Sequence, residues 1–130
     1  MTDEGGSGGA LNFELLAASL RADTADTRTW VEVLGQKLAG ALPSRVRLHR
    51  GGLFGNGAVD GMAADLGGWR FALRLEHGEP IAERTHLVRG IALKTEALPL
   101  DAWIDTLVAA LAELAATSAR ERNAIQGLLS

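Results

Sequence analysis

The sequence predicts an α+β fold: a two-layer sandwich in which a four-stranded antiparallel meander sheet carries N-terminal and C-terminal helices on one face, in the order α-β-β-β-β-α. Two observations carry this prediction. Apolar residues recur every three to four positions before residue 43 and after residue 98, which is typical of amphipathic helices. Between these segments apolar and polar residues alternate, which is typical of half-buried strands joined by glycine-rich turns.

Length and composition favour a single domain. The chain has 130 residues, of which 47% are hydrophobic and 22% charged, and a chain of this kind buries one core. Glycine and polar residues dominate positions 1–10. We expect a flexible tail there, because such a segment buries too little apolar surface to offset its ordering entropy. Residues 11–130 are expected to form one α+β domain.

Two helical runs are predicted before Pro43. The first follows Asn12, a candidate N-cap. The second carries an apolar stripe at spacings of three and four, formed by Trp30, Val31, Leu34, Leu38 and Leu42. It starts either at Thr29, which forms a possible capping box with Glu32, or at one of the earlier candidates Asp23, Thr24 and Asp26. The sequence leaves open whether the two runs form one helix or two.

Four strands are predicted between residues 45 and 95. The first covers residues 45–50, and a connection with an Asn56-Gly57 pair, suited to a tight hairpin, leads to the weakest strand at residues 59–66. Residues 69–76 show the clearest alternation, with Trp69, Phe71, Leu73 and Leu75 on one face. The fourth is a long extended segment from residue 81 to residue 95, with a bend or bulge near Gly90.

The C-terminal helix opens near Asp101, whose carboxylate suits the positive end of the helix dipole. Its broad apolar stripe contains Trp103, Ile104, Leu107, Val108, Leu111 and Leu114. Ser118 and Glu121 have the spacing of a capping box, so they either begin a separate terminal helix or lie within a continuous one. The stripe must be buried, and the apolar face of the strands supplies its cover.

Charge and cysteine content argue against several classes of protein. A net charge of −3 gives no overall electrostatic footprint for nucleic acid. The chain has no cysteine, so it has no disulfide and no thiolate metal site, which agrees with a reducing compartment and predicts a cytoplasmic location. No apolar run approaches the length of a membrane span. The excess of arginine over lysine, with abundant alanine, glycine and leucine, indicates a bacterial source.

The sheet face turned away from the helices is the first candidate site, and we call it the basic face. The alternation places on it Arg45, Arg47, His49, Arg70 and Arg74, with Arg84, His86 and Lys94 as additions, and few acidic residues among them. Guanidinium groups on a rigid sheet can bind phosphate or carboxylate, so the ligand would be nucleic acid, another anion or an acidic protein segment. The alternative is a solvated face without a ligand. No aromatic residue falls on this face, which disfavours base stacking.

The glycine-rich connection Gly51–Gly57, which we call the docking loop, is the second candidate. Leu53 and Phe54 lie in it between glycines. Either they tuck back against a helix end, or they form a docking point for a partner or a membrane surface. The loop lacks the Lys-Ser/Thr pair of a phosphate-binding loop, so no nucleotide site is predicted.

No catalytic, cofactor-binding or metal site is predicted. His49, His77 and His86 lack the spacing of metal ligands. Residues 5–9 match the G-x-S-x-G pattern of hydrolases, but no strand precedes them. The expected protein is therefore a small non-enzymatic interaction or adaptor module, with no cofactor.

Self-association is also predicted, as a homodimer formed through surplus apolar helix surface that contains Trp30, Val31, Ile125, Leu128 and Leu129. In the alternative arrangement, the N-terminal and C-terminal helices cover each other within one chain. The alternative function is anion or nucleic-acid binding through the basic face.

Overall fold

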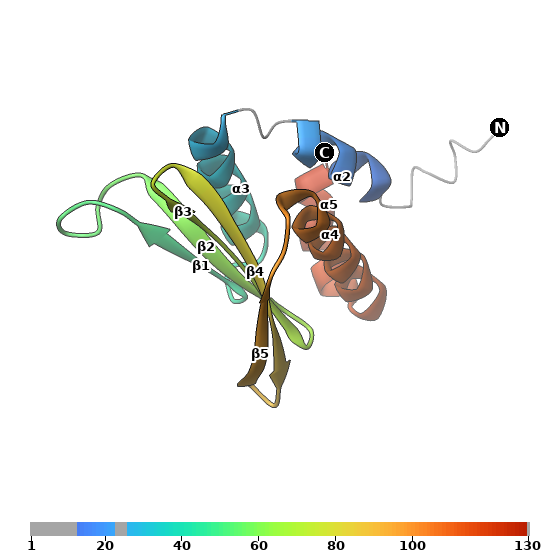
Figure 1. The fold of residues 1–130 in the computed structure, drawn as a ribbon. Coiled ribbons are helices and arrows are strands. Elements are labelled where there is room, and N and C mark those ends of the chain that lie inside the picture. The colour runs from blue at the N-terminus through green and yellow to red at the C-terminus, as the bar shows by residue number, and fades with distance from the viewer. Residues whose placement is uncertain (1–12, 23–25, 130) are drawn as a thin grey trace.

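The computed structural model describes residues 13–22 and 26–129 (Figure 1). The expected tail at residues 1–10 and the candidate caps Asn12, Asp23 and Thr24 lie outside the described residues. Within them the chain forms an α+β fold whose centre is an open antiparallel sheet in the order β1-β2-β3-β4-β5. The strands are β1 (Val46–Arg50), β2 (Val59–Leu66), β3 (Trp69–Glu76), β4 (Glu79–Val88) and β5 (Ile91–Ala97).

The prediction of four strands is wrong, because the long fourth segment is folded into two. Arg89 and Gly90 have φ angles of 54° and 80°, and Val88 pairs directly with Ile91 across them. Two consecutive residues with positive φ form the two-residue turn that matches the twist of a hairpin, so the chain reverses instead of bending. His77 and Gly78, with φ angles of 54° and 82°, join β3 to β4 in the same way.

Four helices flank the sheet in the described part of the chain: α2 (Phe13–Ala22), α3 (Thr27–Ala41), α4 (Leu100–Thr117) and α5 (Ala119–Leu129). Both questions that the sequence left open are answered by breaks between helices. Asp26 caps α3 by accepting a hydrogen bond of 3.3 Å from the backbone N–H of Thr29. Ser118 Oγ accepts one of 3.2 Å from the N–H of Glu121, which starts α5 as a separate helix.

The core lies between one face of the sheet and helices α3 and α4 (Figure 1). Phe71 and Trp103 are almost completely buried, and their rings meet edge to face with centroids 6.3 Å apart. The indole N–H of Trp103 donates to the backbone carbonyl of Glu83 at 3.0 Å, so the buried polar atom is satisfied. Burial of each large apolar side chain stabilises the fold by roughly 1.5–3 kcal/mol.

The terminal helices pack on the other helices. α2 contacts α4, while α5 contacts both α3 and α4. Trp30, Val31 and Ile125 are buried within the chain, with exposed fractions of 5%, 0% and 0%. These three residues therefore form no surplus surface for the predicted helix-mediated dimer, because the N-terminal and C-terminal helices cover each other. Leu128 of the same predicted surface is half-buried, and the side chain of Leu129 lies outside the described residues.

Candidate interaction surfaces

The strand register decides which side chains share a face of the sheet, because residues paired across antiparallel strands point the same way. Arg47 lies in a row with Ala63, Ala72 and Glu83, and His49 lies in a row with Gly61 and Arg74. Arg70 is paired with Asp65 and Thr85. None of these rows contains the buried residues Phe71 and Leu73. Arg47, His49, Arg70 and Arg74 therefore lie on the face away from the core, as predicted.

Arg84 and His86 lie on the opposite face, so their assignment to the basic face is wrong. Arg84 pairs with Phe71 and His86 with Trp69. The guanidinium carbon of Arg84 is 4.2 Å from the centroid of the Trp69 ring, and His86 stacks on that ring at 4.6 Å. Lys94, paired with His86, shares their face. The error arose because β4 has no clean alternation, with apolar residues at both odd and even positions.

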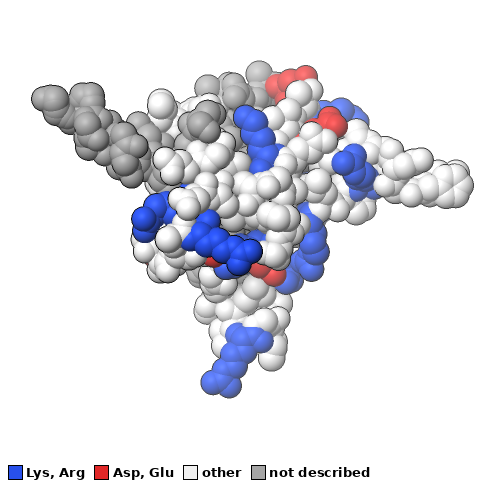
Figure 2. Space-filling model, turned by 180° about the vertical axis from the view of Figure 1, so that it is seen from behind, with Lys and Arg blue, Asp and Glu red and all other residues white. Residues whose placement is uncertain are grey.

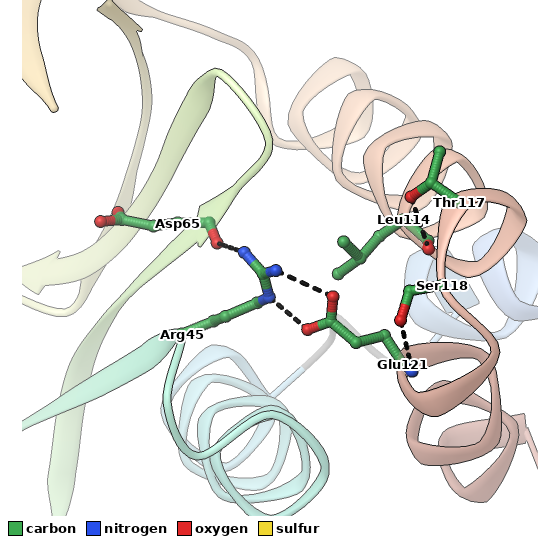
Figure 3. Close-up of polar contacts among 6 residues, drawn as sticks. All are labelled: Arg45, Asp65, Leu114, Thr117, Ser118 and Glu121. Carbon is green, nitrogen blue, oxygen red and sulfur yellow. Dashed lines mark hydrogen bonds and ion pairs between the residues drawn. The ribbon is translucent and has the colours of Figure 1, made fainter. Parts of the chain in front are cut away.

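Arg45 does not lie on the basic face either, so this assignment is also wrong. It lies in the turn before β1 and reaches the helical side, where two of its guanidinium nitrogens donate to the carboxylate of Glu121 in α5 (Figure 3). A third donates to the backbone carbonyl of Asp65 at 3.4 Å (Figure 3). Arg45 therefore joins the sheet to the last helix and is not available to a ligand in this geometry.

Carboxylates neutralise most of the basic face, contrary to the expectation that few acids interrupt it. Arg70 forms two hydrogen bonds with Asp65, at 2.7 and 3.0 Å. These bonds raise the pKa of Arg70 and lower that of Asp65. Arg74 contacts Glu76 and Glu83, both at 3.0 Å. His49 Nδ1 lies 2.5 Å from Asp60 Oδ1.

Arg47 differs from these residues. It is exposed and has no ion pair within 4 Å in the described residues. It still acts at longer range, since it contributes to the lowered pKa of Asp65. One such guanidinium is a much weaker anion site than the array that the sequence predicted.

The docking loop places its two apolar side chains in solvent. Leu53 is 90% exposed and Phe54 is 83% exposed, so the alternative in which they tuck against a helix end is wrong. The loop projects from the sheet beside β1 (Figure 1). In Figure 2 the projection on the right shows no Lys, Arg, Asp or Glu, in agreement with the uncharged sequence of residues 51–58.

Hydrogen bonds at its base hold the docking loop closed. The N–H of Gly51 donates to the carbonyl of Ala58 at 3.0 Å, and the N–H of Gly57 donates to the carbonyl of Gly51 at 2.8 Å. The positive φ angles belong to Gly52 and Gly55, at 91° and 69°. The predicted Asn56-Gly57 hairpin turn is therefore wrong. Gly57 is required for a different reason: a Cβ there would lie 2.7 Å from the carbonyl oxygen of Gly51.

An apolar groove of about 550 Å³ lies between the helices, and sequence reasoning missed it. Leucines from α2, α3, α4 and α5 line most of it, together with Trp30 and Val33. Leu15 and Val33 are 65% and 44% exposed. The usable signal was Val33, which is apolar and yet lies outside the apolar stripe predicted for its helix.

In residues 13–22 and 26–129, no three His, Asp or Glu side chains converge in a way that could hold a metal ion. Over the same ranges, no helix has the length and apolar character needed to cross a bilayer. Comparison of the chain with protein-family models, with curated proteins and with solved structures gave no match.

Proposed function

We propose that this chain is a non-enzymatic protein-interaction module that binds a partner protein through Leu53 and Phe54 of the docking loop. The exposure of these two side chains, 90% and 83%, is the observation that carries the proposal. The other phenylalanines and tryptophans in the described residues are buried or half-buried. Burying Leu53 and Phe54 in a partner would contribute roughly 1.5–3 kcal/mol each.

The closed base of the loop supports the proposal. Two backbone hydrogen bonds, from Gly51 to Ala58 and from Gly57 to Gly51, tie the ends of the loop together. Less conformational entropy is then lost when the tip is immobilised on binding. Because the loop carries no charge, we expect the affinity to change little with salt concentration.

Anion or nucleic-acid binding through the basic face is the weaker proposal. Arg70 and Arg74 would have to exchange carboxylate partners that they already hold at 2.7–3.0 Å. Arg47 supports it, since it is exposed and has no ion pair within 4 Å in the described residues. Phosphate binding would weaken steeply as salt rises, which separates the two proposals.

A photo-crosslinking amino acid at position 54 of the full chain tests the first proposal in native extract. We expect an adduct of one discrete mass, formed equally at low and high salt. Excess unlabelled wild-type chain should suppress it, and excess Phe54→Ser chain should not. The same probe at Gln36, which is exposed on α3, is the control position.

Equal competition by the Phe54→Ser chain, or the same adduct from position 36, would overturn the docking-loop proposal. A pull-down from the same extract at low salt tests the basic face. Nucleic acid recovered with the wild-type chain, but not with an Arg47→Glu/Arg74→Glu chain, would support that face instead.

A further inference from the structure

The two edges of the sheet differ in how they are protected against pairing with another strand. Both edge strands have a register irregularity, between His49 and Arg50 in β1 and at Leu93 in β5. β1 has only five residues, and the exposed charges on it, Arg47 and Arg50, are both positive. These features are typical of edges that resist further pairing. β5 has seven residues, of which only Lys94 and Glu96 are charged. All of its residues except Glu96 are exposed, including Ile91 at 64% and Leu93 at 61%.

The hydrogen bonds between β4 and β5 show which backbone groups face outward. The N–H of Leu98, just after β5, donates to the carbonyl of Ala82 at 2.9 Å. Bonded and non-bonded pairs alternate along an antiparallel ladder. Glu96 is thus bonded to β4, and Thr95 belongs to a non-bonded pair with Thr85. The N–H and C=O of Thr95 therefore point away from the sheet.

The side chains of Thr85 and Thr95 support this assignment. Side chains approach more closely in non-hydrogen-bonded pairs than in hydrogen-bonded ones. The two hydroxyl oxygens of this pair lie 2.7 Å apart, which is hydrogen-bonding distance. A second strand laid along β5 would therefore find the N–H and C=O of Thr95 unused by the ladder.

We infer that β5 pairs with β5 of a second copy of this chain, antiparallel and about a two-fold axis at Thr95. In this register Thr95 faces Thr95 of the second copy, and each Thr95 donates to and accepts from the other. Lys94 lies opposite Glu96 of the second copy, and the symmetry forms this pair twice. Oε2 of Glu96 already accepts from Arg84 within its own chain, so Lys94 would be the second cation beside this carboxylate.

Charge complementarity selects this register and this occupant. A shift of the axis by one position, to Lys94, would place two lysines opposite each other, and like charges directly opposite destabilise a sheet. It would also aim backbone groups that already bond to β4 at the partner strand. With the axis at Thr95, Lys94 faces Glu96 of the second copy, and the backbone groups that meet at Thr95 are ones that do not bond to β4.

The place of β5 in the fold leaves this edge accessible and the docking loop free. The β4–β5 hairpin extends beyond the helices, while the docking loop lies beside β1 at the other side of the sheet (Figure 1). The inference extends the proposed function, since the dimer would present two docking loops. Failure of this inference can be distinguished from failure of the proposed function. Phe54→Ser should leave the dimer intact, and loss of the dimer should leave each docking loop exposed.

Sedimentation equilibrium of the full chain, with two variants at one position, tests the inference. Thr95→Ala removes the hydroxyl and keeps the N–H, so the dimer should persist. Thr95→Pro removes an N–H that does not bond to β4, and proline is tolerated on the outward side of an edge strand. We expect Thr95→Pro to weaken dimerisation at least ~10-fold, because two symmetric hydrogen bonds are lost. Circular dichroism checks that both variants keep the wild-type spectrum.

A cysteine-free chain also allows a direct test of the register. Thr95→Cys should form an intermolecular disulfide on mild oxidation, because hydrogen-bonded antiparallel pairs have Cα atoms about 5.5 Å apart. Arg47→Cys on the opposite edge is the matched control. The inference is overturned if the wild type sediments as a monomer, if Thr95→Pro dimerises as tightly as Thr95→Ala, or if both cysteine variants crosslink at the same rate.

Discussion

Arg45 and Glu121 form a two-pronged ion pair that joins the turn before β1 to the first turn of α5, across 76 residues of sequence (Figure 3). Both side chains are partly buried, at 32% and 19% exposure. The pair is further ordered at each end, since Arg45 contacts the carbonyl of Asp65 and the N–H of Glu121 is capped by Ser118 (Figure 3). It stabilises the position of the last helix.

Replacement of Glu121 by glutamine should destabilise the fold by about 1–2 kcal/mol, since a charge-assisted pair is lost from a partly buried site. Urea denaturation followed by circular dichroism measures this change. Glu113→Gln is the matched control: Glu113 is exposed on α4, so its replacement should change the stability by less than about 0.5 kcal/mol. Equal effects of the two substitutions would contradict a structural role for the pair.

Acid should remove this stabilisation. The hydrogen bonds from Arg45 hold the pKa of Glu121 below its ordinary value of 4.5, and those from Arg70 hold the pKa of Asp65 below 3.8. Groups with a lowered folded-state pKa stabilise the fold above the unfolded pKa, and this contribution is lost as pH falls through the folded-state pKa. The melting temperature should therefore be flat from about pH 7 to 5.5 and fall below about pH 4.5.

The same titration with Glu121→Gln provides the comparison. The difference in melting temperature between wild type and this variant should be largest near neutral pH. It should shrink toward zero in acid, because protonated Glu121 resembles glutamine in charge. A difference that stays constant from neutral pH to about pH 3 would show that the charge of Glu121 contributes nothing.

Two glycine substitutions should have opposite effects on stability. A Cβ at Gly57 would lie 2.7 Å from the carbonyl oxygen of Gly51, so Gly57→Ala must distort the base of the docking loop and should cost about 1–3 kcal/mol. At Gly40, in α3, a Cβ would have no other atom within 4 Å among its described surroundings. Gly40→Ala should stabilise the helix by about 0.5–1 kcal/mol. Thermal unfolding of both variants against wild type measures the two shifts.

Two phenylalanines should respond differently to replacement by alanine. Phe71 is 1% exposed, so Phe71→Ala should cost about 3–5 kcal/mol through the cavity it leaves. Phe54 is 83% exposed, and Phe54→Ala should change the stability by less than about 0.5 kcal/mol. Chemical denaturation of the two variants measures this contrast. A large loss from Phe54→Ala would mean that the side chain packs within the fold and is not a docking residue.

The strand from Trp69 to Glu76 could be predicted from its own sequence pattern. Its alternation predicts both its bounds and its buried face, because each apolar residue on that face has a polar or small neighbour in the sequence. The segment from residue 81 to residue 95 carries no such alternation. There the faces depend on pairing with β3, which brings Ala82 opposite Leu73 and Arg84 opposite Phe71. The alternation of apolar and polar residues within one strand does not specify which residues of the neighbouring strand it pairs with.

The sequence by itself determined the α+β class, the antiparallel meander and the helical stripes, because these follow from the spacing of apolar residues typical of helix and strand. It also placed Leu53 and Phe54 in an uncharged loop, because glycine-rich segments favour turns. Only the tertiary structure decided which arginines meet carboxylates, which side of the sheet Arg84 occupies, and which backbone groups of β5 remain unpaired. Those properties depend on partners distant in sequence, such as Glu121 for Arg45. Their positions are set by strand register and helix packing, not by the residues beside them in the chain.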